Sequence, residues 1–287
     1  MTRSTISTVL LRTVVALGAI ALLVGASIYG ASEWMVRREH AIPLEPFVSL
    51  PTTAEMTEGH RLAILVGCLK GCHGPEGEGG KVEAPGVFKI TAPPLSSVLP
   101  SYTDPELVRL VRFGVKRDGV SALGMPAGTF FPLGTGDLAQ IIAHLRQLPP
   151  TPTVQRERQL EPVARIALVL GEWHTSADEV DASAQRWGDL PRTNPFERGR
   201  YLVSIVCAEC HGLDLRGKEF LRSPPLTIIR AYDLEQFTRL MRTGELRSGK
   251  REGLMSEVAR DAFGQFTEQE VEDIYTYLRE RGEVQWR

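Results

Sequence analysis

The stretch Cys207-Ala208-Glu209-Cys210-His211-Gly212 occurs twice in this chain, once in a variant form. The earlier copy, Cys68-Leu69-Lys70-Gly71-Cys72-His73-Gly74, has the same order of residue types and one more residue between the cysteines. The four cysteines of these two stretches are all that the 287 residues contain, too few for a disulfide-stapled scaffold. Two close thiols followed directly by an imidazole, twice, are therefore the feature from which fold and chemistry can be predicted.

Further landmarks follow each cysteine motif in the same order. A Pro-Pro-Leu segment comes first, then an Arg-Leu-x-Arg segment, then a methionine, and last a helix with one apolar stripe. Met125 and Met255 are 130 positions apart. The other landmarks are Pro93-Pro94-Leu95 and Pro224-Pro225-Leu226, Arg109-Leu110-Val111-Arg112 and Arg239-Leu240-Met241-Arg242, and Leu138, Ile141, Ile142, Leu145 and Val271, Ile274, Tyr275, Leu278. This order predicts a duplicated domain.

The repeat divides the chain into segments. Pro149-Pro150-Thr151-Pro152 closes the first copy as a stiff linker. The predicted segments are 1–40, an N-terminal membrane anchor or signal peptide with its flank; 41–51, a spacer; 52–148, the first domain; 149–193, the connecting linker; and 194–287, the second domain. Within the linker, the apolar stretch Val163 to Leu170 is expected to pack on a domain.

Helix signals dominate both copies, and each is expected to form three helices with long loops. Because no segment alternates convincingly between apolar and polar residues, the predicted fold class is all-α. Thr52-x-x-Glu55 and Thr267-x-x-Glu270 are capping boxes, and Asp104-Pro105 and Asn194-Pro195 pair an N-cap with a proline at the first helical position.

The N-terminal segment is suited to a membrane. Thr13 to Ala31 carry no charge, and nineteen helical residues extend about 28 Å, enough to cross a hydrocarbon core. An uncleaved anchor is favoured over a cleaved signal peptide because the apolar run is long for a signal core and Tyr29 is bulky for a cleavage site near Ala31. Either alternative sends the rest of the chain across the membrane. A net charge of −2 leaves no basic field for nucleic acid.

Cys-x-x-Cys-His is the attachment pattern for c-type haem. Two thiols reach the two vinyl groups on one edge of the porphyrin, and His211 presents its imidazole to the iron. A helical turn would place Cys207, Cys210 and His211 on one side. A disulfide, a zinc half-site or a redox pair are the alternatives. Zinc needs about four ligands and no second cysteine pair exists within either copy, while the redox motif normally follows a βαβ pattern that is absent here.

The first motif departs from this pattern because Cys68 and Cys72 are separated by three residues. Cys68 would still lie on the same helical side if the turn held, and Gly67 and Gly71 would let the backbone loosen. Two thioether bonds are predicted; a single bond through Cys72 is the alternative. His73 is the expected iron ligand in either case.

The sixth iron ligand is expected to be Met125 in the first copy and Met255 in the second. Neither lies on an obvious apolar helix face, and both follow a helix that ends near a glycine. Other candidates are weaker: Met241 is expected in the core, and Met56, His40, His60, His144 and His174 lack an equivalent in the other copy or suit surface and packing roles. Pro94 and Pro225 belong to rigid loops that could supply a carbonyl to the ligating histidine, and the alternative is simply a stiff turn.

These residues resemble the class I cytochrome c family, in tandem, as a membrane-anchored dihaem cytochrome c. The resemblance covers roughly 52–148 and 194–284 and rests on Cys207-x-x-Cys210-His211 with Met255 and on Cys68-x-x-x-Cys72-His73 with Met125. It implies three main helices around each haem, two haem c groups, and His/Met axial pairs. The extra residue in the first motif and a glycine-rich insertion from Gly74 to Gly86 are departures.

The resemblance implies a one-electron relay rather than an enzyme, with no small-molecule substrate. The expected location is the inner membrane, as a single-pass protein with its haem domains on the periplasmic side. Expected partners are the membrane and redox proteins of a respiratory or other membrane system, such as an oxidase, a quinol-oxidising complex or a dehydrogenase. The alternatives are a dihaem peroxidase, which needs one open iron position, and a fixed haem subunit of a larger complex.

Overall fold

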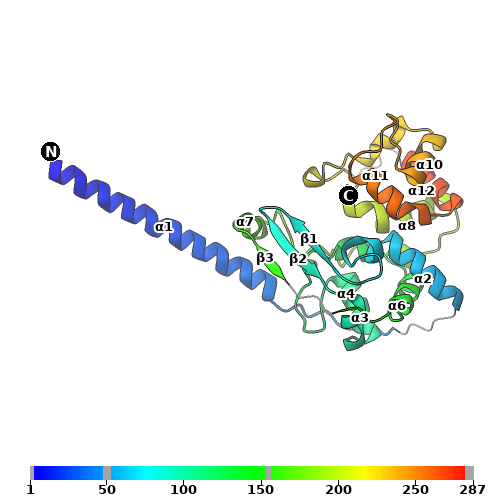
Figure 1. Cartoon of the computed structure of the whole chain (residues 1–287), viewed down its shortest axis with the longest axis horizontal. Coiled ribbons are helices and arrows are strands. Elements are labelled where there is room, and N and C mark those ends of the chain that lie inside the picture. The colour runs from blue at the N-terminus through cyan, green and yellow to red at the C-terminus, as the bar shows by residue number, and fades with distance from the viewer. Residues whose placement is uncertain (1–2, 48–52, 153–156, 282–287) are drawn as a thin grey trace.

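The computed structural model describes residues 3–47, 53–152 and 157–281, and this part of the chain is mostly helical (Figure 1). A long helix, α1, projects from the globular part. The α-helices are α1 (Arg3–Arg37), α2 (Thr53–Leu65), α3 (Leu95–Val98), α4 (Asp104–Phe113), α5 (Ala127–Phe130), α6 (Thr135–Leu145), α7 (Pro162–Leu170), α8 (Pro195–Leu202), α9 (Ala208–His211), α10 (Leu234–Thr243), α11 (Gly253–Asp261) and α12 (Glu268–Glu280). The strands are β1 (Gly80–Ala84), β2 (Phe88–Ala92) and β3 (Arg158–Leu160).

The first and last helices of each repeat cross at a glycine. In the first repeat α2 packs on α6, and a Cβ added at Gly59 would lie 2.0 Å from the carbonyl oxygen of Gln140. In the second repeat α8 packs on α12, and a Cβ at Gly199 would lie 1.9 Å from the carbonyl oxygen of Asp273. At both crossings the two helix backbones are so close that any residue larger than glycine would clash.

The middle helices, α4 and α10, are also built alike. α4 begins with a capping box between Thr103 and Glu106, and α10 begins with one between Asp233 and Gln236. Each helix ends at a glycine in the left-handed region. The expectation that Asp104 caps α4 is wrong by one residue, because the Thr103 side chain accepts the hydrogen bond from the helix.

Two other helix starts agree with the sequence. Asn194 caps α8 with proline at the next position, and Thr267 forms its capping box with Glu270 at the start of α12. The predicted box at Thr52 falls outside the described residues. These starts depend on contacts within four residues, which is why the sequence reveals them.

Polar contacts between loops and helices recur in both repeats. An arginine near the end of the middle helix, buried in the first repeat and partly exposed in the second, donates to the loop before the last helix. A tyrosine hydroxyl accepts a backbone hydrogen bond in both repeats. The pairs are Arg112 Nη2 to the Leu133 carbonyl at 2.9 Å, Arg242 Nη1 to the Phe266 carbonyl at 2.5 Å, Arg117 N to the Tyr102 hydroxyl at 3.5 Å and Arg247 N to the Tyr232 hydroxyl at 3.3 Å. Equivalent residues thus make equivalent bonds.

A small sheet corrects the all-α prediction. The strands β1, β2 and β3 pair antiparallel in that order, with Val82 opposite Ile90 and Lys89 opposite Gln159. β1 and β2 lie in and just after the glycine-rich insertion of the first repeat, and β3 comes from the linker (Figure 1). The sheet was missed because its strands are short and the β2–β3 pairing joins segments far apart in the sequence.

The linker also forms helix α7, which packs against the end of α1 and near the sheet. Ala164 and Leu168 of α7 join Val36 and Leu160 in a small hydrophobic cluster. Phe88 and Leu123 of the first repeat pack against this cluster, so the expectation that Val163 to Leu170 packs on a domain is confirmed for the face with Ala164 and Leu168.

The two repeats share one continuous hydrophobic core. Leu62, Ile141 and Val108 of the first repeat belong to the same cluster as Ile205 and Ile274 of the second. Polar contacts add to this interface, because Arg61 of α2 pairs with Glu270 of α12 at 2.8 Å. The repeats are therefore packed on each other rather than strung on a flexible linker.

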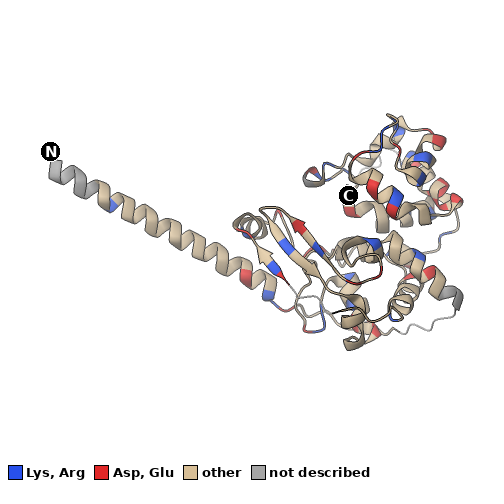
Figure 2. Cartoon of the chain, viewed as in Figure 1, with Lys and Arg blue, Asp and Glu red and all other residues tan. Residues whose placement is uncertain are grey.

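Helix α1 is long and apolar enough over Leu10–Arg37 to cross a membrane. Between Arg12 and Glu33 it carries no charged residue (Figure 2). Its large apolar side chains, such as Leu22 and Leu23, are exposed. None of the residues that the structure describes covers them.

Candidate functional site

The second cysteine motif forms a continuous helical turn. Cys207 ends a π-helical turn and Ala208 to His211 form α9, and the residues at the junction have helical dihedral angles. This geometry places Cys207, Cys210 and His211 on neighbouring positions of one turn, as the sequence predicted. His211 is buried, with 9% of its surface exposed.

The first cysteine motif has a different backbone. Gly67 lies in the left-handed region, and Leu69, Lys70 and Gly71 have non-helical dihedral angles. The helical turn does not hold here, so Cys68 and Cys72 do not share one side of a helix, and the backbone loosens at Gly67 and Gly71 as the sequence allowed. The extra residue is accommodated by a tight loop, which the Lys70 N–H closes on the Gly74 carbonyl at 3.1 Å.

Both motif histidines make the same hydrogen bond. Nδ1 of His73 lies 2.8 Å from the Pro93 carbonyl oxygen, and Nδ1 of His211 lies 2.8 Å from the Pro224 carbonyl oxygen. Since a carbonyl only accepts, Nδ1 carries the proton in each ring and Nε2 keeps its lone pair. The Pro-Pro loops have the role considered for Pro94, but the first proline of each pair supplies the carbonyl.

The hydrogen bond from each histidine to a proline carbonyl shows whether the residues fit a haem. A ligating histidine normally donates its second nitrogen to a carbonyl, which holds the ring in one orientation and leaves the other nitrogen for the metal. Burial also lowers the pKa of His73 and His211, which favours the neutral imidazole that binds metals. The donor set therefore fits an iron ligand in both motifs.

Two glycines that the sequence reading missed hold the proline loops in place. Gly79 donates its N–H to the His73 carbonyl at 2.8 Å, and Gly217 does the same to His211 at 2.8 Å. Both have positive φ, and a Cβ would lie 2.8 Å from the Ala92 carbonyl oxygen at Gly79 and 2.4 Å from a backbone oxygen at Gly217. A signal was present, since each glycine lies six residues after its histidine.

The four motif cysteines are free thiols. Burial raises the pKa of Cys68 and of Cys207 to about 12, and it also raises the pKa of Cys72 and Cys210. Burial therefore favours the neutral thiol form of these four side chains. Within the described residues, no group of three or more His, Cys, Asp or Glu side chains could hold a metal ion.

The two candidate methionines both pack, partly buried, against the shared hydrophobic core. Met125 lies in a loop before α5, where its N–H donates to the Ser176 hydroxyl at 3.2 Å. Met255 lies in the first turn of α11 rather than in a loop. Both follow the glycine that ends the middle helix, as expected. Met241 is fully buried within α10, in agreement with a packing role.

The two cysteine motifs lie next to each other at the interface between the repeats. A Cβ added at Gly67 would lie 3.9 Å from Oε2 of Glu209, which belongs to the second motif. The charge of Glu209 also raises the pKa of Cys68 and Cys72 in the first motif. Burial raises the pKa of Glu209 itself. No sequence pattern indicated this arrangement.

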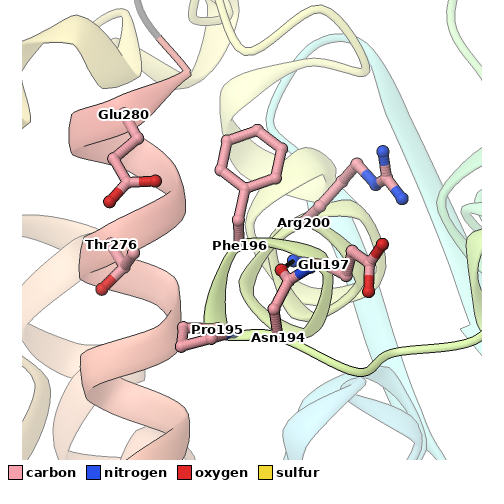
Figure 3. Close-up of a pocket in the computed structure, with 7 residues that line it drawn as sticks. All are labelled: Asn194, Pro195, Phe196, Glu197, Arg200, Thr276 and Glu280. Atoms are coloured by element: carbon pink, nitrogen blue, oxygen red, sulfur yellow. Dashed lines mark hydrogen bonds between the residues drawn. The ribbon is translucent and has the colours of Figure 1, made fainter.

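A pocket lies elsewhere, between α8 and α12 (Figure 3). Phe196 and Arg200 come from α8, and Thr276 and Glu280 come from α12. None of the predicted haem-binding residues lines it, and it is open to solvent. The pocket is therefore separate from the cysteine motifs.

The second repeat is a small helical domain in which two thiols and a buried histidine share one helical turn, and a backbone carbonyl orients the histidine ring. These features define a class of proteins that attach haem covalently. Residues 196–281 match the family of cytochrome c. This part of the chain is thus a cytochrome c domain, which implies covalently bound haem c and is typical of electron-transfer proteins. No curated protein was found to match the chain.

Proposed function

We propose that this chain is a membrane-anchored dihaem cytochrome c that relays single electrons. The observation that carries the proposal is the matched pair of hydrogen bonds from His73 to Pro93 and from His211 to Pro224. The second of these lies in the cytochrome c domain, so the same bond in the first repeat supports a second haem there.

The architecture around the first motif supports this extension. The backbone crossing at Gly59 repeats the one at Gly199, and α4 is capped and terminated as α10 is. Gly79 braces the loop behind His73 as Gly217 braces the loop behind His211. We therefore treat 52–148 and 194–287 as two cytochrome c domains in tandem.

The proposed site residues are the same in kind in both domains. Cys68 and Cys72, and Cys207 and Cys210, would hold the porphyrin edges, and His73 and His211 would be the fifth ligands. Met125 and Met255 would be the sixth ligands from the opposite side. A bound haem of this type supplies a one-electron iron couple, whose potential a methionine ligand raises. The chain's part is to orient the imidazoles, bury the site and fill both axial positions.

The packing of the two domains supports a relay rather than two independent carriers. The cysteine motifs meet near Gly67 and Glu209, and one hydrophobic core joins the domains. Attachment points that lie side by side would hold the two haems close to each other, which a relay requires. The apolar helix α1 would hold this pair on the outer face of the inner membrane, next to a membrane-bound oxidase, quinol-oxidising complex or dehydrogenase.

Haem count tests the proposal directly. The full chain should be produced with a c-type maturation system, and its intact mass measured before and after digestion. We expect two covalent haems, and one haem fewer in each of the double variants Cys68→Ser/Cys72→Ser and Cys207→Ser/Cys210→Ser. The digest also tells whether Cys68 itself carries a thioether.

Two results would overturn it. A wild-type chain with one haem, unchanged by the first double variant, would restrict haem attachment to the second domain. A high-spin fraction with peroxide turnover in the two-haem protein would favour the dihaem peroxidase, since that enzyme needs an open iron position. Met241→Leu is the control variant for the second domain. Because Met241 is a buried methionine with no proposed ligand role, this variant should keep both haems in the low-spin state.

A further inference from the structure

Helix α7 has an apolar face that no part of the described chain covers. Ala164 and Leu168 are buried against the fold. On the other face Val163, Ile166 and Leu170 are exposed, by 58% at Val163 and 69% at Leu170. Their spacing of three and four residues forms one stripe along the helix. Such an uncovered stripe on a helix of the linker is suited to an apolar partner.

The position of α7 identifies that partner. Arg165 of α7 donates to the Ser32 hydroxyl at 2.9 Å and to Glu33 at 3.1 Å, and its guanidinium lies 4.1 Å from the centre of the Tyr29 ring. These three residues belong to α1. Figure 1 shows α7 next to the C-terminal part of that helix.

This contact lies where the apolar part of α1 ends. Glu33 is the first charged residue after the uncharged run, and it is only four residues, about 6 Å along the helix axis, from Tyr29. Trp34 is 63% exposed at the same level, as expected for an aromatic side chain at a membrane–water interface. If α1 crosses a bilayer, α7 is held at the height of the bilayer surface.

We propose that the exposed stripe of α7 lies in the interfacial layer of the same bilayer that α1 crosses. The inference rests on the proposed membrane anchoring. The charges beside α7 agree with it, because the side chains of Arg37 and Arg158 are partly exposed near Glu33 and can meet lipid phosphates. Contact at two elements, α1 and α7, fixes the orientation of the first repeat on the membrane, which a single flexible tether cannot do.

Depth measurements on the full-length holoprotein in phosphatidylcholine–phosphatidylglycerol vesicles test the proposal. A nitroxide label is attached to Leu170→Cys on α7, to Leu17→Cys on α1, and to Leu234→Cys, an exposed leucine on α10 of the second repeat. The chain without an added cysteine gives the background labelling. Accessibility to oxygen, which enters lipid, is compared with accessibility to a water-soluble nickel chelate.

We expect labels 17 and 170 to be shielded from the chelate, and label 234 to be fully accessible to it. If label 17 is shielded and label 170 is as accessible as label 234, α7 does not contact lipid and the inference fails while the anchoring stands. If label 17 is accessible to the chelate, the proposed anchoring itself fails. Label 170 could also be shielded by a second copy of the chain. In that case its spectrum is broadened by the label on the other copy, dilution with unlabelled protein removes the broadening, and the inference is overturned.

Discussion

The hydroxyl of Tyr201 in the second repeat donates a hydrogen bond to Oδ2 of Asp137 in the first repeat, over 2.5 Å. Arg192 binds the same carboxylate oxygen at 3.0 Å and lies over the Tyr201 ring at 4.3 Å. Tyr201 is almost completely buried. This contact joins α8 to α6 and helps to set the position of one repeat on the other.

Replacement of Tyr201 by phenylalanine should weaken the interface. The hydrogen bond to a charged acceptor is lost, so we expect the free energy of unfolding to fall by about 1.5–3 kcal/mol in urea titrations. Tyr275→Phe is the control, because its hydroxyl donates only to the neutral Tyr232 carbonyl within the second repeat. Equal losses in the two variants would contradict a special role for the interface bond.

Substitution of Gly199 by alanine should destabilise the second repeat. The new methyl group would meet the Asp273 carbonyl oxygen at 1.9 Å, so α8 and α12 must move apart. We expect a loss of about 1–3 kcal/mol in the free energy of unfolding. Gly136→Ala in α6, where nothing lies within 4 Å of the added Cβ, should instead leave stability unchanged or raise it by up to about 1 kcal/mol. A neutral Gly199→Ala would mean that the crossing is looser than described.

The Met255→His variant tests the proposed sixth ligand. A second imidazole in place of the thioether should lower the reduction potential of one haem and remove about half of the weak far-red methionine–iron absorption. Redox titration followed optically reports both changes. The Met241→Leu control should alter neither, since Met241 is buried in α10. An unchanged spectrum for Met255→His would remove Met255 from the ligand set.

The stability of the protein should fall as the pH rises through the range in which Glu179 ionises. Burial raises the pKa of Glu179 to about 7, with Lys218 opposing the shift and Glu209 adding to it. The unfolded carboxyl ionises near pH 4.3, so between about pH 4.3 and 7 the folded state binds more protons than the unfolded state. Stability is therefore lost over this window and does not change further above it from this group.

Unfolding titrations at pH 5 and pH 8 measure the effect. Glu179→Gln should reduce the difference in unfolding free energy between the two pH values and should be more stable than the natural chain at pH 8. Glu257→Gln, at an exposed position of α11, is the control and should keep the difference. A pH dependence that survives unchanged in Glu179→Gln would assign it to other groups, Glu209 first among them.

Local features of both repeats could be predicted from the sequence because they depend on neighbouring residues. Asn194 and the Thr267 capping box start their helices as expected, and Cys207 to His211 form one turn. The carbonyl role of the proline loop behind each histidine was one of two alternatives that the sequence offered, and Pro93 and Pro224 rather than the following prolines supply the carbonyl. In each case the atoms involved belong to one short segment or to a motif that occurs twice.

Other features depend on segments that meet only in space. β3 pairs with β2 although most of the first repeat separates them in the sequence. The residues between Cys68 and Cys72 form a loop and not the helical turn that would place both cysteines on one side. The residue pattern determined by itself the repeated motif, the starts of α8 and α12, and the apolar N-terminal segment, because those are properties of consecutive residues. Only the packed chain decided that Glu209 lies against Gly67 and α7 against α1, because burial of apolar surface selects among long-range contacts that leave no periodic trace in the sequence.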